Sequence, residues 1–246
     1  MTELAGIELI KPDWPAPANV HAFTTTRNGG FSQGPWDSFN LGASCGDDSQ
    51  HVEKNRRLLS GLLPSEPRWL RQVHGTAVVG WDRANILGIE ADAIVSNQAG
   101  QVCAVLTADC LPVLFCNKAG THIAAAHAGW RGLAAGVLEA TVLAMECKPA
   151  DLMAWMGPAI GPRAFEVGKD VYDAFTSLSI ENSIVFKPHR DRWLADIYQL
   201  ARMALTSIGI TQISGGQHCT FEEKSRFFSY RRDAETGRMA SVIWLE

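Results

Sequence analysis

Three side chains in this sequence are of types that bind metal ions and that also take part in nucleophilic catalysis. His74 lies in LRQVHG, Cys110 in the apolar stretch TADCLPVLFC, and His127 in HAGWRG. One cysteine and two histidines are suitable zinc ligands, and a catalytic zinc site keeps a fourth position for water or substrate. The spacing of the three residues matches no short metal signature. A metal site, a Cys–His nucleophile pair and an ordinary buried cysteine with two hydrogen-bonded histidines therefore all stay open.

The segments around Cys110 and His127 predict that both lie at strand ends. Apolar runs at 102–109, 112–116 and 121–128 predict strands, and the turn-like NKAG predicts that the last two form a hairpin. Asp109 and Cys110 are at the position where the first strand should end, because Pro112 disfavours a continuous ladder. Gly129 and Gly132 flank Trp-Arg where a strand passes into a helix, so helix amides point toward His127, an arrangement that favours anions. Cys110 and His127 become neighbours if the two strand ends lie side by side.

The rest of the chain mixes the two kinds of secondary structure. Segment 24–42 is rich in Gly, Ser and Asn and is predicted to be a long loop. A mixture of strands and helices with a hairpin predicts an α/β architecture with a mixed sheet. The further predicted strands are 20–25, 77–82, 91–96, 152–157, 211–214, 227–232 and 241–245, and the predicted helices are 49–62, 133–146, 169–178 and 193–209.

Composition sets limits on the class of protein. The chain has 246 residues, of which 46% are hydrophobic and 20% charged, and it shows no repeat or linker, which favours one domain over residues 1–246. The net charge of −4 suggests neither a nucleic-acid nor a membrane partner. The N-terminal segment lacks the pattern of a secretory signal. The six cysteines include no Cys-x-x-Cys pair, which indicates reduced thiols and a cytoplasmic protein.

Eight short motifs occur in an order that resembles a known family. The resemblance is to the YfiH-type family, long called laccase-domain proteins or polyphenol oxidases, and it runs from about residue 20 to the C-terminus. TADC with HAGWRG is its most specific part. The motifs are TTRNGGFS (25–32), QVHG (72–75), ADA (91–93), TADCLPV (107–113), AHAGWRG (126–132), GPAIG (157–161), FEV (165–167) and FFSYRRD (227–233).

The resemblance implies a fold, a metal site and an activity. The family fold is a single α/β domain with mixed sheets sandwiched between helices, in α/β/β/α order. The family's His, Cys and His zinc ligands fall on His74, Cys110 and His127. The implied activity is that of a purine nucleoside phosphorylase acting on adenosine, inosine, guanosine and S-methyl-5′-thioadenosine, with adenosine deaminase activity. The family also contains a member described as a peptidoglycan editing factor.

Phosphorolysis needs groups that hold phosphate, and deamination needs a group that moves protons. Arg27 in the Gly-rich loop and Arg56 in the first helix are candidates for binding phosphate. The alternative is that each arginine only lies on the surface or braces a loop. Asp109 is a candidate acid or base, or a residue that orients a metal ligand. The expected partners are purine nucleosides and inorganic phosphate, and the expected state is a monomer or a weak homodimer.

Two other activities compete with this one. Cys110 as a nucleophile, with His127 or His74 as its base, would make a cysteine-type hydrolase that edits a peptidoglycan precursor. Copper laccase chemistry needs many histidines, including His-x-His pairs. The chain has seven histidines and no His-x-His, which is too few for a copper cluster.

Overall fold

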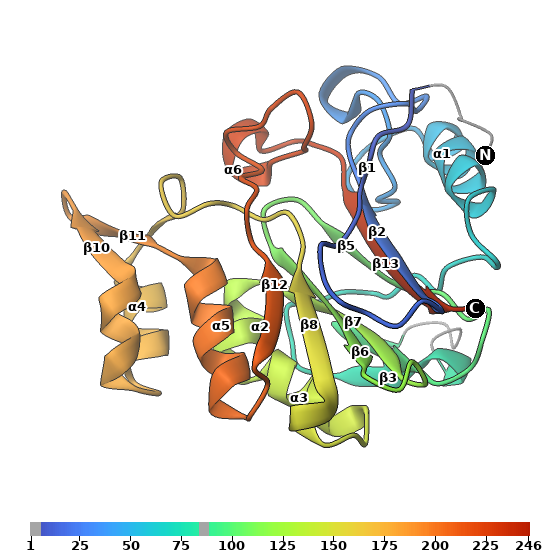
Figure 1. Cartoon of the computed structure of the whole chain (residues 1–246). Helices are drawn as coiled ribbons and strands as arrows, with labels where there is room; N and C mark the ends of the chain where they lie inside the picture. Colours follow the sequence, from blue (N-terminus) through green and yellow to red (C-terminus); the bar gives the residue numbers. More distant parts are fainter. Residues whose placement is uncertain (1–5, 84–88) are drawn as a thin grey trace.

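Two β-sheets lie face to face at the centre of the fold, and helices cover both outer faces (Figure 1). The computed structural model describes residues 6–83 and 89–246; the first five residues of the N-terminal segment lie outside this range. The predicted mixed α/β architecture with sheets sandwiched between helices is confirmed.

One of the two sheets has four antiparallel strands and is covered by a single helix. The helix, α1 (Ser49–Ser60), was predicted from the sequence, and the carboxylate of Asp48 caps it by accepting a hydrogen bond from the Gln50 amide at 2.8 Å. The strands, in spatial order, are β1 (Leu9–Ile10), β2 (Val20–Thr25), β13 (Met239–Leu245) and β5 (Cys103–Thr107).

The other sheet has six strands and is mixed. Its centre is the predicted hairpin of β6 and β7, which pair antiparallel, whereas β12 pairs parallel to β8 and β3 parallel to β4. The strands, in spatial order, are β12 (Gln212–Gly215), β8 (Leu152–Met156), β6 (Leu111–Asn117), β7 (Ile123–Ala128), β4 (Ala93–Ser96) and β3 (Val78–Gly80).

Helices pack on the outer face of this second sheet, and a small sheet lies beside them (Figure 1). The helices are α2 (Trp130–Ala135), α3 (Val137–Ala144), α4 (Lys169–Thr176) and α5 (Ile197–Ser207). The remaining elements are β9 (Glu166–Val167), β10 (Phe186–His189), β11 (Arg192–Ala195), α6 (Tyr230–Asp233) and the 3₁₀ turns Gly34–Trp36, Trp81–Arg83, Pro149–Asp151 and Ile180–Val185.

Strand β6 shows why its sequence is apolar without a break. Side chains alternate between the two faces of a strand. Val113 and Phe115 pack in the cluster that contains the helices, whereas Leu114 and Cys116 pack in the cluster between the two sheets. Both faces are therefore buried, which explains the apolar run from Leu111 to Cys116. This rigid central hairpin supports the polar residues that lie at its open end.

Three predicted elements differ from the structure. The predicted helix 133–146 begins earlier, at Trp130, and is divided at Gly136, whose φ of 95° is left-handed. The predicted helix 193–209 is wrong at its start, because the first three of its residues belong to β11 and the helix begins at Ile197. The predicted strand 227–232 is wrong: Phe227 and Phe228 are buried in a loop, and α6 begins at Tyr230.

None of the helices among the described residues has the length and apolar character required to cross a membrane.

Candidate metal centre and its cavity

The structure brings His74, Cys110 and His127 together. One potential ligand atom from each residue lies within 4.8 Å of the others. The sulfur of Cys110 is 3.7 Å from Nε2 of His74, and the two imidazole rings meet edge to face with their centroids 4.8 Å apart. His127 is buried, Cys110 is partly buried and His74 is exposed, so the cluster opens to solvent on one side.

The β6–β7 hairpin places Cys110 beside His127. Pro112, the second residue of β6, pairs with His127 near the end of β7, and Cys110 precedes β6 directly. In an antiparallel hairpin, the start of the first strand lies beside the end of the second. The expectation that these two strand ends are adjacent is therefore confirmed.

Asp92 joins the remaining ligand, His74, to the hairpin. Asp92 precedes β4, which pairs with β7, and its side chain is buried. Its carboxylate accepts hydrogen bonds from the amides of Val73, His74 and Gly75 at 3.2, 2.9 and 2.7 Å. The turn that carries His74 is thereby tied to the edge of the six-stranded sheet.

The Asp92 carboxylate also fixes the orientation of His127. Nδ1 of His127 lies 2.8 Å from Oδ1 of Asp92. An ionised carboxylate only accepts hydrogen bonds, so Nδ1 carries a proton and Nε2 is the ring nitrogen that remains to bind a metal. A carboxylate that orients a ligating histidine is a common feature of metal sites. Sequence reasoning noted the ADA motif but gave Asp92 no role.

The charges of these residues depend on one another. Burial alone would raise the pKa of the Cys110 thiol, but the positive charge of His127 and the hydrogen bonds from both histidines hold this pKa below its ordinary value. Burial likewise would lower the pKa of His127, but Cys110 and Asp92 raise it. Burial would raise the pKa of Asp92, yet the bonds from His127 and the amides of Gly75 and Val73 lower it. The lowered pKa of Cys110 favours its thiolate, the form that binds metals.

The backbone around the cluster has two uncommon features: positive φ angles at non-glycine residues and a close approach at a glycine. His74 and Asp109 have positive φ angles of 61° and 82°, which non-glycine residues seldom adopt. Gly129 begins the first turn of α2, and a Cβ atom there would lie 2.8 Å from Cδ2 of His74 and 3.0 Å from the sulfur of Cys110. The glycine in HAGWRG therefore lets the helix approach the two ligands.

Asp109 has contacts that position the Cys110 loop. Its carboxylate accepts hydrogen bonds from the hydroxyls of Thr220 and Ser229, at 2.6 and 3.0 Å, and from the Arg231 amide at 2.6 Å. The side chain is buried, with 8% of its surface exposed. These contacts join the loop that carries Cys110 to the C-terminal segment.

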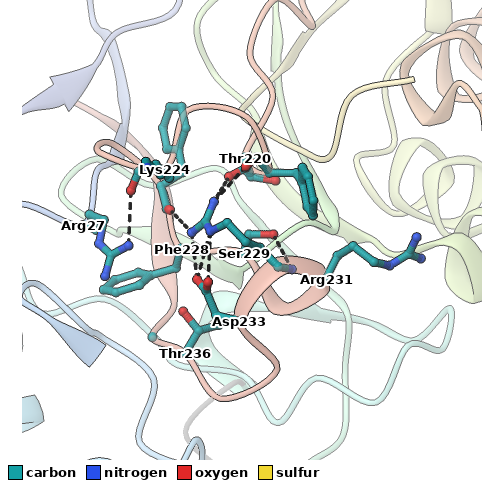
Figure 2. A network of polar contacts seen from close by, with 12 residues as sticks. Arg27, Thr220, Lys224, Phe228, Ser229, Arg231, Asp233 and Thr236 are labelled. Atoms are coloured by element: carbon teal, nitrogen blue, oxygen red, sulfur yellow. Dashed lines mark hydrogen bonds and ion pairs between the residues drawn. The ribbon is translucent and has the colours of Figure 1, made fainter. Parts of the chain in front are cut away.

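The cluster lies on a cavity of about 1010 Å³, whose lining also includes Asp109 and Arg56. Arg56 donates two hydrogen bonds to the Leu41 carbonyl, at 3.0 and 2.9 Å, and stacks on Trp69. Arg27 does not line this cavity; it donates to the Asp37 carbonyl at 2.8 Å and to the Lys224 carbonyl at 3.2 Å, the second of which Figure 2 shows. The structure thus separates Arg27 from the metal cluster, and the contacts of both arginines are those of residues that brace a loop.

The donor set fits a zinc ion. Zinc binds thiolate and imidazole ligands, and three protein ligands leave a position for substrate. The ligand atoms are close together, and the contact of Nδ1 with Asp92 leaves Nε2 of His127 as the nitrogen that can bind the metal. Within residues 6–83 and 89–246, this is the one group of three or more His, Cys, Asp or Glu residues close enough to share a metal. A multicopper cluster needs several groups of histidine ligands, and the described residues contain no second group of this kind.

Comparison with known proteins gives consistent matches over the whole chain. Purine nucleoside phosphorylase YfiH of Escherichia coli is 58% identical over 240 residues, which is 97% of this chain and 99% of that protein. Purine nucleoside phosphorylase PA4543 of Pseudomonas aeruginosa is 54% identical and covers 96% of this chain and 98% of its own.

Two solved structures have the same fold. Protein NMB0706 of Neisseria meningitidis matches with a TM-score of 0.94 and 51% identity over 97% of this chain and 99% of its own. YlmD of Geobacillus stearothermophilus matches with a TM-score of 0.90 and 31% identity, over 100% of this chain and 98% of its own. A family model described as multi-copper polyphenol oxidoreductase laccase matches residues 21–246. The chain therefore belongs to this laccase-named family, together with the YfiH proteins.

Proposed function

We propose that this protein is a zinc-dependent purine nucleoside phosphorylase that also deaminates adenosine. The observation that carries the proposal is a His–Cys–His cluster on a cavity large enough for a nucleoside, in a chain whose relatives are named purine nucleoside phosphorylases. Ligand sites usually have volumes of about 300–1,000 Å³. The proposed substrates are adenosine, inosine, guanosine and S-methyl-5′-thioadenosine.

The proposed zinc ligands are His74, Cys110 and His127. When bound, zinc supplies Lewis-acid chemistry and lowers the pKa of water, which suits attack on a polar carbon such as C6 of adenine. Asp92 keeps the proton on Nδ1 of His127, so that Nε2 is a ligand atom. Cys110 is held as a thiolate by the two histidines beside it.

Phosphorolysis and deamination make different demands on the cavity. In phosphorolysis a phosphate oxygen forms a bond to C1′ of the ribose, and the bond to the purine nitrogen breaks with its electron pair on the purine. Arginines suit the phosphate, because a guanidinium donates two parallel hydrogen bonds to one anion. In deamination water replaces ammonia at C6, so no phosphate is needed.

The cavity also offers aromatic side chains for the purine. Trp130, Phe165 and Tyr230 line it, and aromatic rings favour stacking with a planar base. We keep Asp109 as a proposed proton-transfer group, although its contacts favour positioning. Arg27 and Arg56 were the expected phosphate ligands, but their guanidinium groups already donate to backbone carbonyls, which favours bracing.

Metal analysis and product analysis together test this proposal. Wild-type protein should carry one zinc ion per chain, and Cys110→Ser should lose most of it. Cys147→Ser is the matched control, because Cys147 is partly buried and lies outside the cavity lining. The metal-loaded wild type should convert adenosine to inosine without phosphate, and should release hypoxanthine from inosine only with phosphate. Full zinc retention in Cys110→Ser would refute the ligand assignment.

A second candidate is a cysteine-type hydrolase that edits a peptidoglycan precursor. Cys110, His127 and Asp92 form an ordered thiol, imidazole and carboxylate series, which is the arrangement of a cysteine nucleophile with its base. Removal of zinc by a chelator distinguishes the two candidates. A nucleophilic thiol would retain or gain amide hydrolysis after chelation, whereas the nucleoside reactions should stop.

A further inference from the structure

Five arginines line the main cavity, and they differ in how many of their donors are already bonded. They are Arg56, Arg71, Arg131, Arg231 and Arg238, and Asp109 is the one acidic residue among the described residues of that lining. The chain as a whole has a net charge of −4, so this concentration of positive charge is local. A cavity with one sign of charge concentrates ligands of the opposite sign.

Three of these arginines are bonded to neighbouring residues, Arg56 through two guanidinium nitrogens and Arg71 and Arg238 through one each. Arg56 donates to the Leu41 carbonyl through two nitrogens. Arg71 pairs with Glu90 at 3.0 Å. Arg238 donates to the carbonyls of Thr236 and Gly237 at 2.7 and 2.9 Å. Their side chains hold neighbouring loops in place.

Arg131 is different, because its guanidinium has no hydrogen bond or ion pair with any residue that the structure describes. It stacks on the ring of its neighbour Trp130, with the guanidinium carbon 4.4 Å from the ring centroid. Stacking holds the guanidinium in place and leaves its N–H groups in the plane available for an anion. Arg131 follows Gly129 in the first turn of α2, the turn that packs against His74 and Cys110.

Arg231, like Arg71 and Arg238, is bonded through one guanidinium nitrogen, and its place in the cavity distinguishes it from them. Its neighbour Arg232 shows what a fully bonded guanidinium looks like. Arg232 donates to the carbonyls of Thr220, Phe221 and Phe227 and pairs with Asp233. Figure 2 shows the Arg231 side chain extending away from this network. Nη1 of Arg231 donates to the carbonyls of Glu166 and Ala164 at 2.7 and 3.5 Å, and Nε and Nη2 have no partner among the described residues.

Arg131 and Arg231 also occupy a distinctive place. A second cavity of about 450 Å³ shares four lining residues with the main one: Trp130, Arg131, Phe165 and Arg231. The two arginines therefore lie where the cavities meet. Both are close to the metal site: Arg131 lies in the first turn of α2, and the backbone amide of Arg231 donates a hydrogen bond to the carboxylate of Asp109, the residue before Cys110.

We infer that Arg131 and Arg231 form the subsite that binds inorganic phosphate in this cavity. The inference rests on the proposed phosphorylase function and specifies its anion site. It moves this role away from Arg27 and Arg56, whose guanidinium groups are bonded to backbone carbonyls. Two arginines with open donors can hold a phosphate dianion through charge-assisted hydrogen bonds, each worth about 1.5–3 kcal/mol, the equivalent of roughly a 10- to 150-fold change in affinity.

The test measures phosphate binding and phosphate kinetics separately. Zinc-loaded wild type, Arg131→Gln and Arg231→Gln are titrated with inorganic phosphate by calorimetry, and the KM for phosphate is measured with inosine. The exposed Arg57→Gln, whose arginine pairs with Glu53, is the control. Each cavity variant should weaken phosphate binding and raise this KM by about tenfold or more, with zinc content unchanged. Arg131→Lys should bind phosphate more tightly than Arg131→Gln and less tightly than wild type, because lysine restores the positive charge but not the two parallel hydrogen bonds of a planar guanidinium.

The outcomes separate the subsite from the proposed function. Wild-type phosphate affinity and KM in both variants would overturn the inference while leaving phosphorolysis intact. If the two variants lose zinc as well as phosphate binding, the inference would also be overturned, because the arginines would then support the metal site. If wild type binds phosphate but does not cleave inosine, and the variants bind phosphate more weakly, the subsite stands and the phosphorylase proposal fails.

Discussion

Oδ1 of Asp92 lies 2.8 Å from Nδ1 of His127, and the same buried carboxylate accepts the amide hydrogen of His74 at 2.9 Å. One side chain therefore orients a proposed metal ligand and fixes the backbone of another. It does so between segments far apart in the chain, because Asp92 and His127 are separated by 35 positions.

Replacing Asp92 by asparagine should weaken zinc binding. The amide side chain would keep the shape but lose the charge that stabilises the ligand set, and loss of such an outer partner typically reduces metal affinity about 10- to 100-fold. The measurement is competition for zinc with a chromophoric chelator. Asp173→Asn, on the exposed surface of α4, is the control. Equal zinc affinity in Asp92→Asn and wild type would show that the carboxylate does not support the site.

Gly129→Ala should disturb the site without changing any ligand. The new methyl group would lie 2.8 Å from Cδ2 of His74 and 3.0 Å from the Cys110 sulfur, so at least one ligand must move. Overpacking of this kind costs about 1–3 kcal/mol. Zinc content should fall in Gly129→Ala and stay normal in Gly80→Ala, where a methyl group meets no atom within 4 Å. Normal zinc content in both would contradict the close approach of α2 to the ligands.

Zinc removal should expose Cys110 to alkylation. The metal-free thiol has a lowered pKa and is partly exposed, whereas burial raises the pKa of Cys103 and Cys116. Iodoacetamide should modify Cys110 rapidly in chelated protein and slowly in zinc-loaded protein, as followed by peptide mass spectrometry. The two buried thiols should stay unmodified in the folded protein. Equal alkylation of Cys110 with and without zinc would argue against its role as a ligand.

Glu223 should contribute stability that depends on pH. Burial alone would raise its pKa, but hydrogen bonds from the Cys219 amide, His218 and Arg226 hold the pKa below the ordinary value of 4.5. A lowered folded-state pKa stabilises the fold above the ordinary value, and this contribution is lost as pH falls through the folded-state pKa. Glu223→Gln should therefore lower the Tm at pH 7, and the difference from wild type should shrink near pH 3. A constant difference at both pH values would contradict this account; Glu53→Gln, at an exposed pair, is the control.

The sequence predicted the parts of the fold whose pattern is local. The apolar runs that became β5, β6 and β7 are continuous because both faces of their sheets are covered, and NKAG marked the hairpin. Segment 193–196 was assigned to a helix because Trp193 and Leu194 are apolar, yet they pair with Val167 and Glu166 in a small sheet. That pairing is a long-range contact, and a local pattern does not record it.

The site was predictable to a different degree for each of its residues. His74, Cys110 and His127 were candidates from their residue types and positions, and the resemblance made them the expected zinc ligands, because their spacing matches no metal signature. The structure does bring them together. Asp92 was missed because a buried aspartate before a strand has no distinctive pattern. Arg131 and Arg231 look like other arginines in the sequence, and only their contacts show which donors are already bonded.

The most direct test of the central claim is chromatography of the products formed from inosine by zinc-loaded protein, with and without inorganic phosphate. The account predicts hypoxanthine and ribose-1-phosphate in equal amounts with phosphate, almost no hypoxanthine without it, and little product from Cys110→Ser. Release of hypoxanthine at the same rate without phosphate would contradict phosphorolysis. No hypoxanthine above the Cys110→Ser level, under conditions where zinc is bound, would contradict the proposed function as a whole.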